Sequence, residues 1–437
     1  MPRLEHDALG ERWIPDQVYW GIHTLRAMEN FPVSARPVRP AWVRALAEVK
    51  LAAARANTEL GLLPPEVGAA LQAAAAEVAE EALADQFPVD ALQGGAGTSL
   101  NMNMNEVLAN RALELLGLPR GAYEHIHPID HVNRCQSTND TVPTALRVAA
   151  IRQVRALSEA LAALQAALQR KEAEFGGIAK LGRTEMQDAV PITLGQEFGA
   201  WAEAIARDRW RLYKTEERLR VINLGGTAIG TGVGAERGYA AKAVQHLRQI
   251  THLGLARAEN LIEATQNSDV LVEVSGLLKA CAVNLAKLAG DLRLLSSGPR
   301  GGLGEIRLPA LQAGSSIMPG KVNPVMTEMV TQVSFSVIAS DQAITLAAQA
   351  GQLELNAFLP LMGDHLLGAA ELLTQAATLL RTRCIEGIEA DPERCAELLD
   401  RSTAGVTALV PQIGYEAATR IAQRALQSGG NSDDPNQ

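Results

Sequence analysis

The chain has few aromatic residues and few cysteines. Only 4% of its 437 residues are Phe, Trp or Tyr, while 47% are hydrophobic, so aliphatic side chains carry most of the apolar content. Runs of Ala and Leu of this kind favour closely packed helices. The four cysteines, Cys135, Cys281, Cys384 and Cys395, show no C-x-x-C spacing and are too sparse for a disulfide framework. A reducing, cytoplasmic location is therefore expected.

The features of membrane and nucleic-acid-binding proteins are also missing. No stretch approaches the ~18 uninterrupted apolar residues of a membrane span, and the N-terminus has no apolar leader segment. The net charge of −9 argues against nucleic acid or an anionic membrane as a partner. An anionic substrate would have to be attracted by a few local cations. The length exceeds one typical core, so two or three domains are expected.

Residues 314–324, with the sequence GSSIMPGKVNP, place two hydroxyls, one ammonium group and one carboxamide close together. Two prolines remove backbone donors, and Gly314 and Gly320 permit dihedral angles that other residues avoid, so a loop is predicted between helical runs. An ordinary surface connection has a similar composition. A phosphate-binding P-loop is excluded, because five residues rather than four separate Gly314 from Gly320 and a valine follows the lysine.

The pattern Gly-Ser-Ser-x-Met-Pro-x-Lys-x-Asn resembles the signature of the aspartase/fumarase superfamily, whose members eliminate a group β to a carboxylate and release fumarate. In that family the first serine removes the proton from the β-carbon, which implies that Ser315 is the base. The lysine and asparagine hold a substrate carboxylate, which implies this role for Lys321 and Asn323. Loss of the β-proton puts a second negative charge on a carboxylate, so donors and cations must be aimed at it.

Two earlier segments match substrate-binding segments of the family. Residues 94–106 combine a Gly cluster with a predicted helix start, where free N–H groups attract an anion, and the resemblance implies that Thr98 contacts substrate. An ordinary helix cap would have the same composition. Residues 133–144 match the next segment, and the resemblance implies that the substrate-binding trio is Ser137, Thr138 and Asn139.

Two positions distinguish the branches of the superfamily. The opening residues 5–31 resemble aspartases, with His23 where fumarases usually carry Gln. The Ser-Thr-Asn-Asp form that contains Thr138 is the aspartase variant of a segment that usually reads Ser-Ser-Asn-Asp in fumarases. Both positions favour an ammonia-lyase.

Residues 180–198 resemble the family pattern Gly-Arg-Thr-His-x-Gln-Asp-Ala-x-Pro-x-Thr-x-Gly-Gln but depart from it at Glu185, which replaces the histidine. In fumarases that histidine handles the leaving water and pairs with a glutamate corresponding to Glu328, so two carboxylates here disfavour hydration. An anion suits a substrate ammonium group instead, because it attracts the charged form. Glu185 is therefore expected to face the departing amine, and the resemblance implies the same place for Thr184. A position that simply faces water is the alternative.

Two other motifs are rejected. The spacing His125-x-His127-x-x-x-His131 does not put the first two histidines on one helix face, Pro128 interrupts it, and no acidic or cysteine ligands complete the set. We expect no metal and no cofactor. The glycine-rich residues 223–232 follow no predicted strand and lack the G-x-G-x-x-G spacing, so a nucleotide site is rejected.

Apolar residues at helical spacing predict helices over most of the remaining chain. The predicted ranges are 44–63, 66–84, 144–176, 196–220, 268–295, 325–350 and 353–383. The resemblance implies a mainly α fold of three domains: an N-terminal domain (1–138), a central long five-helix bundle (139–387), and a truncated C-terminal domain with a disordered tail (388–437). Four such bundles associate in the family, which implies a homotetramer in which three chains contribute to each active site.

The resemblance implies reversible deamination of L-aspartate to fumarate and ammonia, a small dicarboxylate substrate. Ser315 is expected to take the proton, and Lys321 and Asn323 are expected to bind one carboxylate of the substrate. The substrate amine is expected to lie near Asn139, Thr184 and Glu185. The second carboxylate is expected on Thr98, Ser137, Thr138 and Ser316. Three alternatives stay open: a fumarate hydratase, a lyase for an N-substituted aspartate, and a helical assembly protein that has lost catalysis.

Overall fold

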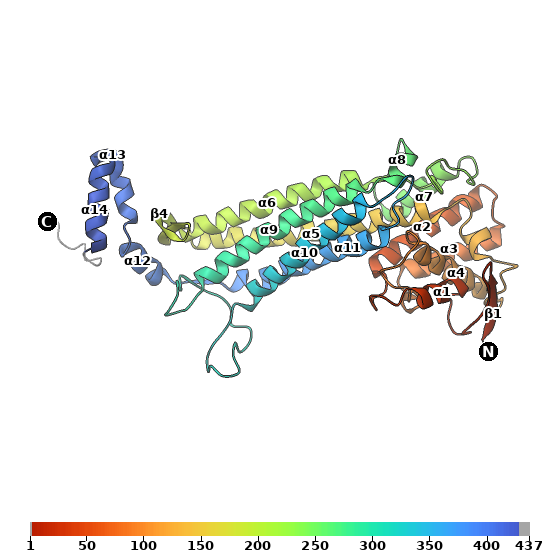
Figure 1. The fold of residues 1–437 in the computed structure, drawn as a ribbon, viewed down its shortest axis with the longest axis horizontal. Helices are drawn as coiled ribbons and strands as arrows, with labels where there is room; N and C mark the ends of the chain where they lie inside the picture. Colours follow the sequence, from red (N-terminus) through yellow and green to blue (C-terminus); the bar gives the residue numbers. More distant parts are fainter. Residues whose placement is uncertain (1, 428–437) are drawn as a thin grey trace. The chain divides into compact units, whose positions relative to one another are not determined.

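The computed structural model describes residues 2–427, and it is mainly helical, as predicted (Figure 1). The predicted disordered tail, residues 428–437, lies outside the described residues. The helices are α1 (Ile22–Asn30), α2 (Pro40–Glu59), α3 (Pro65–Ala79), α4 (Thr98–Leu115), α5 (Thr138–Glu174), α6 (Leu194–Leu219), α7 (Tyr239–Thr251), α8 (Leu261–Gln266), α9 (Asp269–Leu295), α10 (Val325–Gln349), α11 (Leu359–Arg383), α12 (Pro392–Asp400), α13 (Val410–Ile413) and α14 (Tyr415–Gln427), with shorter turns η1 (Ala84–Gln86), η2 (Pro128–Val132), η3 (Ile385–Gly387) and η4 (Ala404–Leu409).

Between residues 2 and 427 the strands form four two-stranded pairs. They are β1 (Arg3–Asp7) with β2 (Gly10–Ile14), β3 (Ala179–Thr184) with β4 (Gln187–Thr193), β5 (Val221–Ile222) with β6 (Ala256–Arg257), and β7 (Ile306–Arg307) with β8 (Glu389–Ala390). All pairs are antiparallel except β5 with β6, which is parallel. The strands are short, and helices supply most of the hydrophobic core of the described residues.

The five-helix bundle is confirmed. It consists of α5, α6, α9, α10 and α11, the long helices through the centre of Figure 1. The buried faces of these helices are aliphatic. Leu157, Leu161 and Leu164 on α5, for example, are all fully buried. Aliphatic residues three and four positions apart share one helix face, so a low aromatic content is enough for this packing.

The prediction that residues 1–40 are irregular, with short strands or turns, is only partly right. β1 and β2 are short strands, but Ile22–Asn30 form α1. Three backbone N–H groups at the start of this helix donate to the buried carboxylate of Glu106 on α4, at 2.7 to 3.1 Å. A carboxylate satisfies the free N–H groups of a helix start and favours its positive end. This cap comes from 83 residues away along the chain, and no local pattern reveals it.

By its internal contacts the chain divides into two compact units, which share the long helices. Unit 1 comprises residues 1–157, 211–279 and 337–371; its core packs α2 against α3, α4 and α7. Unit 2 comprises residues 158–210, 280–336 and 372–437, and in it α12 packs against β3. The three-domain division stays a prediction.

A buried ion cluster joins three segments of unit 2. The Lys180 ammonium group lies 2.8 Å from Glu197 Oε1 and 3.0 Å from Glu305 Oε2, and the Arg183 guanidinium lies 2.9 Å from Glu305 Oε1. The Lys180 side chain is 1% exposed and that of Glu305 is fully buried. Burial raises the pKa of Glu197, because its charged form loses solvation. The cluster connects the β3–β4 hairpin to the segment that leads into residues 314–324.

Lys180→Met is expected to destabilise unit 2 by about 3–5 kcal/mol, because two carboxylates lose their shared cation in a buried site. A circular-dichroism melt would show a clear fall in the midpoint of thermal unfolding. The control is Lys287→Met, which removes an exposed pair with Asp291 and should cost about 1 kcal/mol or less. Equal melting points for the two variants would contradict the structural role of the cluster.

The four cysteines are free and buried. Within residues 2–427 no helix has the length and apolar character needed to cross a membrane.

Candidate active site

Residues 314–324 form the predicted loop, and hydrogen bonds within it fix its shape. The Gly314 N–H donates to the Lys321 carbonyl at 2.7 Å, and the Asn323 Nδ2 donates to the Gly314 carbonyl at 2.7 Å. A Cβ at Gly314 would lie 2.7 Å from the Lys321 carbonyl oxygen, so a side chain does not fit. These contacts bring Asn323 next to the residue that precedes Ser315.

The Ser315 hydroxyl oxygen accepts two backbone N–H groups. The donors are Ile317 at 3.1 Å and Met318 at 2.9 Å. Aligned N–H groups stabilise negative charge on the oxygen they point at, so this geometry favours the deprotonated serine that a base requires. Within one chain Ser315 and Asn323 are half-buried while Ser316 and Lys321 are exposed. One chain alone therefore leaves the loop open to water.

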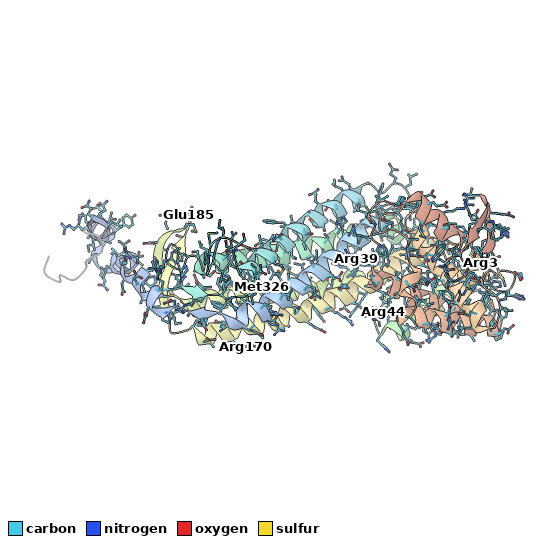
Figure 2. The ribbon with its side chains drawn as sticks, turned by 90° about the horizontal axis from the view of Figure 1, so that it is seen from below. Arg3, Arg39, Arg44, Arg170, Glu185 and Met326 are labelled. Carbon is cyan, nitrogen blue, oxygen red and sulfur yellow. The ribbon has the colours of Figure 1, made fainter. Side chains whose placement is uncertain are left out.

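Glu185 occupies the turn of the β3–β4 hairpin, and Figure 2 shows it at the hairpin tip. Glu185 and Met186, the two residues between the strands, have φ values of +52° and +66°. Two left-handed residues in succession match the type I′ turn that suits the twist of a hairpin. Thr184 and Glu185 are exposed in the single chain. Glu328 corresponds to the glutamate that pairs with the family histidine in fumarases. Its Oε1 lies 3.9 Å from Nη2 of Arg293.

Ser137, Thr138 and Asn139 lie at the start of α5, a helix of 37 residues. The Ser137 N–H donates to Asp140 Oδ1 at 3.0 Å, and the Asn139 N–H donates to the Ser137 hydroxyl at 3.2 Å. These two bonds cap the first turn of the helix. Asp140 is fully buried and also accepts two N–H groups from residues 225 and 227. The cap leaves three half-buried polar side chains at the positive end of a long helix, which favours anion binding.

Thr98 lies at the start of α4, as predicted, and Gly97 precedes the helix with φ +95°. A Cβ at Gly97 would lie 2.9 Å from Val142 Cγ1 on α5, so glycine allows the two helix starts to approach. The Asn101 side chain on α4 donates to the Thr138 hydroxyl at 3.1 Å. Unit 1 therefore brings the starts of α4 and α5 together.

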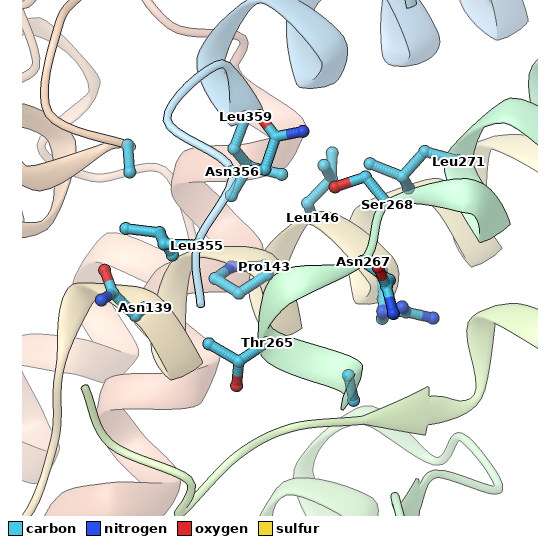
Figure 3. Close-up of a pocket in the computed structure, with 13 residues that line it drawn as sticks. Asn139, Pro143, Leu146, Thr265, Asn267, Ser268, Leu271, Leu355, Asn356 and Leu359 are labelled. Atoms are coloured by element: carbon cyan, nitrogen blue, oxygen red, sulfur yellow. The ribbon is translucent and has the colours of Figure 1, made fainter. Parts of the chain in front are cut away.

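A pocket lies beside Asn139 in unit 1 (Figure 3). Its walls come from α5, α8, α9 and the segment before α11, and its polar lining includes Thr265, Asn267 and Asn356. The Asn139 side chain donates to the Ala228 carbonyl at 2.7 Å, which fixes its orientation at the pocket. The Asn139 carboxamide thus borders a hollow of mixed polarity.

The histidines near residue 127 make local contacts. His127 Nδ1 accepts the N–H groups of Ile129 and Asp130, and His131 Nδ1 accepts the N–H of His127 at 2.8 Å. These bonds shape the η2 turn. In the part of the chain that the structure describes, no three His, Cys, Asp or Glu side chains are arranged to hold a metal ion.

The predicted site residues divide between the two units. Thr98, Ser137, Thr138 and Asn139 belong to unit 1. The base loop and the hairpin tip, with Ser315, Ser316, Lys321, Asn323, Thr184 and Glu185, belong to unit 2. Unit 1 thus holds the polar residues at two helix starts, and unit 2 holds the serine that accepts two N–H groups, in the same loop as Lys321 and Asn323.

Comparison with known proteins gives the family. A family model described as lyase matches residues 10–339. Aspartate ammonia-lyase from Bacillus sp is 48% identical over 427 residues, which cover 98% of this chain and 91% of the relative. The chain belongs to the aspartase/fumarase superfamily.

Solved structures of the superfamily have the same fold. The crystal structure of fumarate lyase:delta crystallin from Brucella melitensis matches with a TM-score of 0.95 and 53% identity, covering 98% of this chain and 94% of that one. A class II fumarase from Schistosoma mansoni also matches with a TM-score of 0.95, at 35% identity over 98% of this chain and 93% of that one. The mainly helical superfamily fold with its long bundle is thereby confirmed.

The superfamily motifs contain Asn101 and Asn133 but did not reveal the lysine behind Thr138. Lys50, Asn101 and Asn133 form a hydrogen-bonded group that ends on the Thr138 hydroxyl. Lys50 lies within the Ala-rich run 44–63, for which the sequence predicted a helix and no functional residue. The helical period of this run predicts an apolar residue at position 50. A lysine there was therefore the sign in the sequence of a functional residue.

Proposed function

We propose that this chain is a carbon–nitrogen lyase that deaminates L-aspartate reversibly to fumarate and ammonia. The observation that carries the proposal is the Ser315 hydroxyl, which accepts two backbone N–H groups in a loop that also holds Lys321 and Asn323. About half of the residues are identical to those of aspartate ammonia-lyases over 98% of the chain, which supports the same reaction.

The first step is proton transfer from carbon. Ser315 Oγ takes the proton from the β-carbon, and the electrons of the broken C–H bond move onto the adjacent carboxylate as an aci-carboxylate. Thr98, Ser137, Thr138 and Ser316 stabilise the two negative charges of this group, aided by the start of α5. Lys321 and Asn323 hold the other carboxylate.

The second step breaks the carbon–nitrogen bond. The electron pair returns to form the C=C bond of fumarate, and ammonia leaves with the electrons of the C–N bond. Asn139, Thr184 and Glu185 face the departing amine, and the carboxylate of Glu185 favours the ammonium form of the bound substrate. The proton on Ser315 is released afterwards, which restores the base.

The assembly that we propose is a homotetramer in the cytoplasm, with three chains around each site. Two observations support it. The base loop is exposed in one chain although the chemistry requires a dry site. Large apolar side chains on the bundle are also exposed, for example Trp210 at 65% and Phe335 at 64%, and burial against other subunits would cover them. The buried free cysteines suit a reducing compartment.

The purified protein is expected to consume fumarate only when ammonium is present, which ultraviolet absorbance of fumarate measures directly. Loss of fumarate without ammonium would instead indicate a fumarate hydratase. Loss only with a larger amine would indicate a lyase for an N-substituted aspartate. No loss under any condition would favour a non-catalytic assembly protein.

Glu185→Gln is expected to raise the KM for L-aspartate by about threefold to tenfold with little change in kcat, since the variant loses attraction for the substrate ammonium group. Steady-state kinetics at neutral pH measure this. The matched control is Asp188→Asn, which removes another exposed carboxylate of the same hairpin. Unchanged kinetics for both variants would mean that Glu185 faces water in the assembled enzyme.

A further inference from the structure

A lysine is buried directly behind the start of α5. Lys50, on α2, is 2% exposed, and its ammonium group donates to Asn133 Oδ1 at 3.0 Å and to Gln136 Oε1 at 2.9 Å. Both acceptors belong to the turn that leads into α5. The charged group that acts on Lys50 from α5 is the buried Asp140, while α4 presents neutral carboxamides to the same turn. A buried ammonium group without a close ion pair is rare and costly.

The lysine determines the direction of the hydrogen bonds around it. A charged lysine can only donate, so the oxygen of the Asn133 carboxamide must face it. That oxygen also accepts the Asn101 and Asn105 side-chain nitrogens, each at 3.2 Å. The nitrogen of Asn101 is thereby fixed as the group that reaches Thr138, where it donates to the hydroxyl oxygen at 3.1 Å.

The hydroxyl hydrogen of Thr138 is available to donate a hydrogen bond. A hydroxyl has one hydrogen, and the Thr138 oxygen already accepts one from Asn101, so its O–H is free to donate to an anion. A carboxylate can only accept hydrogen bonds, so this polarity is the one that binds it. The opposite amide orientation at Asn101 would present an acceptor to Thr138 and would take up its hydrogen.

We propose that Lys50 is a positioning residue for the substrate carboxylate: acting through Asn133 and Asn101, it orients the Thr138 hydroxyl as a donor, and its buried charge adds to the attraction for the anion. The inference rests on the proposed function, because it takes Thr138 as a substrate contact. It adds a residue that does not touch substrate and lies outside the superfamily motifs of the sequence.

The protonation of Lys50 distinguishes a positioning role from a purely structural one. If the role were only structural, binding of the substrate carboxylate would not change the protonation of Lys50. Burial lowers the pKa of Lys50 from 10.5 to about 7, because the charged form loses solvation, and Asp140 partly opposes this shift. Burial raises the pKa of Asp140 to about 6, so Asp140 is ionised above neutral pH. A bound dicarboxylate favours protonated Lys50 and must raise its pKa. Binding between pH 7.5 and 8.5 therefore draws a proton onto the enzyme.

The test uses succinate, which resembles the substrate, has no amine to eliminate and stays fully ionised above pH 7. Isothermal titration calorimetry of the assembled protein, in buffers of different ionisation enthalpy, gives the dissociation constant and the protons taken up. We expect proton uptake by the wild type at pH 8 and none by Lys50→Met. Binding without proton uptake by the wild type would overturn the proposal, and this measurement requires no variant to fold.

A double-mutant cycle tests whether Lys50 acts through Thr138. Lys50→Met is expected to raise the dissociation constant of succinate about tenfold in the wild-type background at pH 6.5, but only about threefold in the Thr138→Val background, where the loss of the buried charge is the one remaining effect. The control is Asn57→Ala, which removes a neutral bond to the Arg134 carbonyl in the same turn and should leave the proton uptake unchanged. Equal effects of Lys50→Met in both backgrounds would overturn the proposal.

Failure of this inference differs from failure of the proposed function. An enzyme that consumes fumarate with ammonium and binds succinate, but takes up no proton, contradicts only the role of Lys50. A protein that neither reacts nor binds succinate contradicts both.

Discussion

Ser315→Ala is expected to lower kcat for L-aspartate by at least about 10³-fold, because the variant loses the group that takes the β-proton. The proton is a very weak acid, and the two N–H groups that now support the Ser315 oxygen would point at no acceptor. The KM should change little, since the contacts assigned to the carboxylates remain. Steady-state kinetics on the purified variant, by fumarate formation, measure both values.

Two controls make this result specific. Size-exclusion chromatography and the melting midpoint of Ser315→Ala should match the wild type, because the side chain is half-buried and small. Ser316→Ala, which removes the neighbouring hydroxyl, should lower kcat far less than Ser315→Ala, because the other groups assigned to the aci-carboxylate remain. Turnover of Ser315→Ala close to that of the wild type would overturn the assignment of the base.

Co-expression of two inactive variants is expected to restore about one quarter of the wild-type activity. One variant carries Ser315→Ala, and the other carries Ser137→Ala with Thr138→Val. If each site takes its base loop from one chain and its α5 start from another, random mixing leaves both segments intact in about one site of four. Both parents alone should be inactive, so a quarter of full activity is a large signal. Hybrids carrying two different affinity tags can be isolated and assayed.

The matched control pairs Ser315→Ala with Lys321→Ala. Both residues lie in the same loop, so every loop in these hybrids lacks one of them and no activity should return. Recovery with this control pair would mean that the loop is not used as a single segment. No recovery with the first pair would contradict a site shared between chains and would favour a site built within one chain.

Local sequence determined the elements whose pattern is complete within a few residues. The prolines and glycines of residues 314–324 exclude a helix, and the loop is found there. The aliphatic spacing after residue 144 predicts a long helix over 144–176, and α5 runs from Thr138 to Glu174. Motifs identified the family in the same way, since Ser315, Lys321 and Asn323 lie within ten residues.

Contacts between distant residues decided what the local pattern left open. The sequence of residues 22–30 did not predict α1, because its first turn is stabilised by Glu106 from α4. Glu185 and Met186 form a hairpin turn without the glycine or asparagine that usually marks one, since pairing of the flanking strands sets their backbone angles.

The sequence by itself therefore determined the family, the bundle helices and the chemical groups of the site, because each depends on residue type and short spacing. Only the tertiary structure decided how those groups are oriented. The Ser315 oxygen faces two N–H groups because the loop closes on itself through Gly314 and Asn323. The Thr138 hydroxyl owes its surroundings to Lys50 on another helix, and hydrogen-bond direction across such distances is fixed only when the chain is folded.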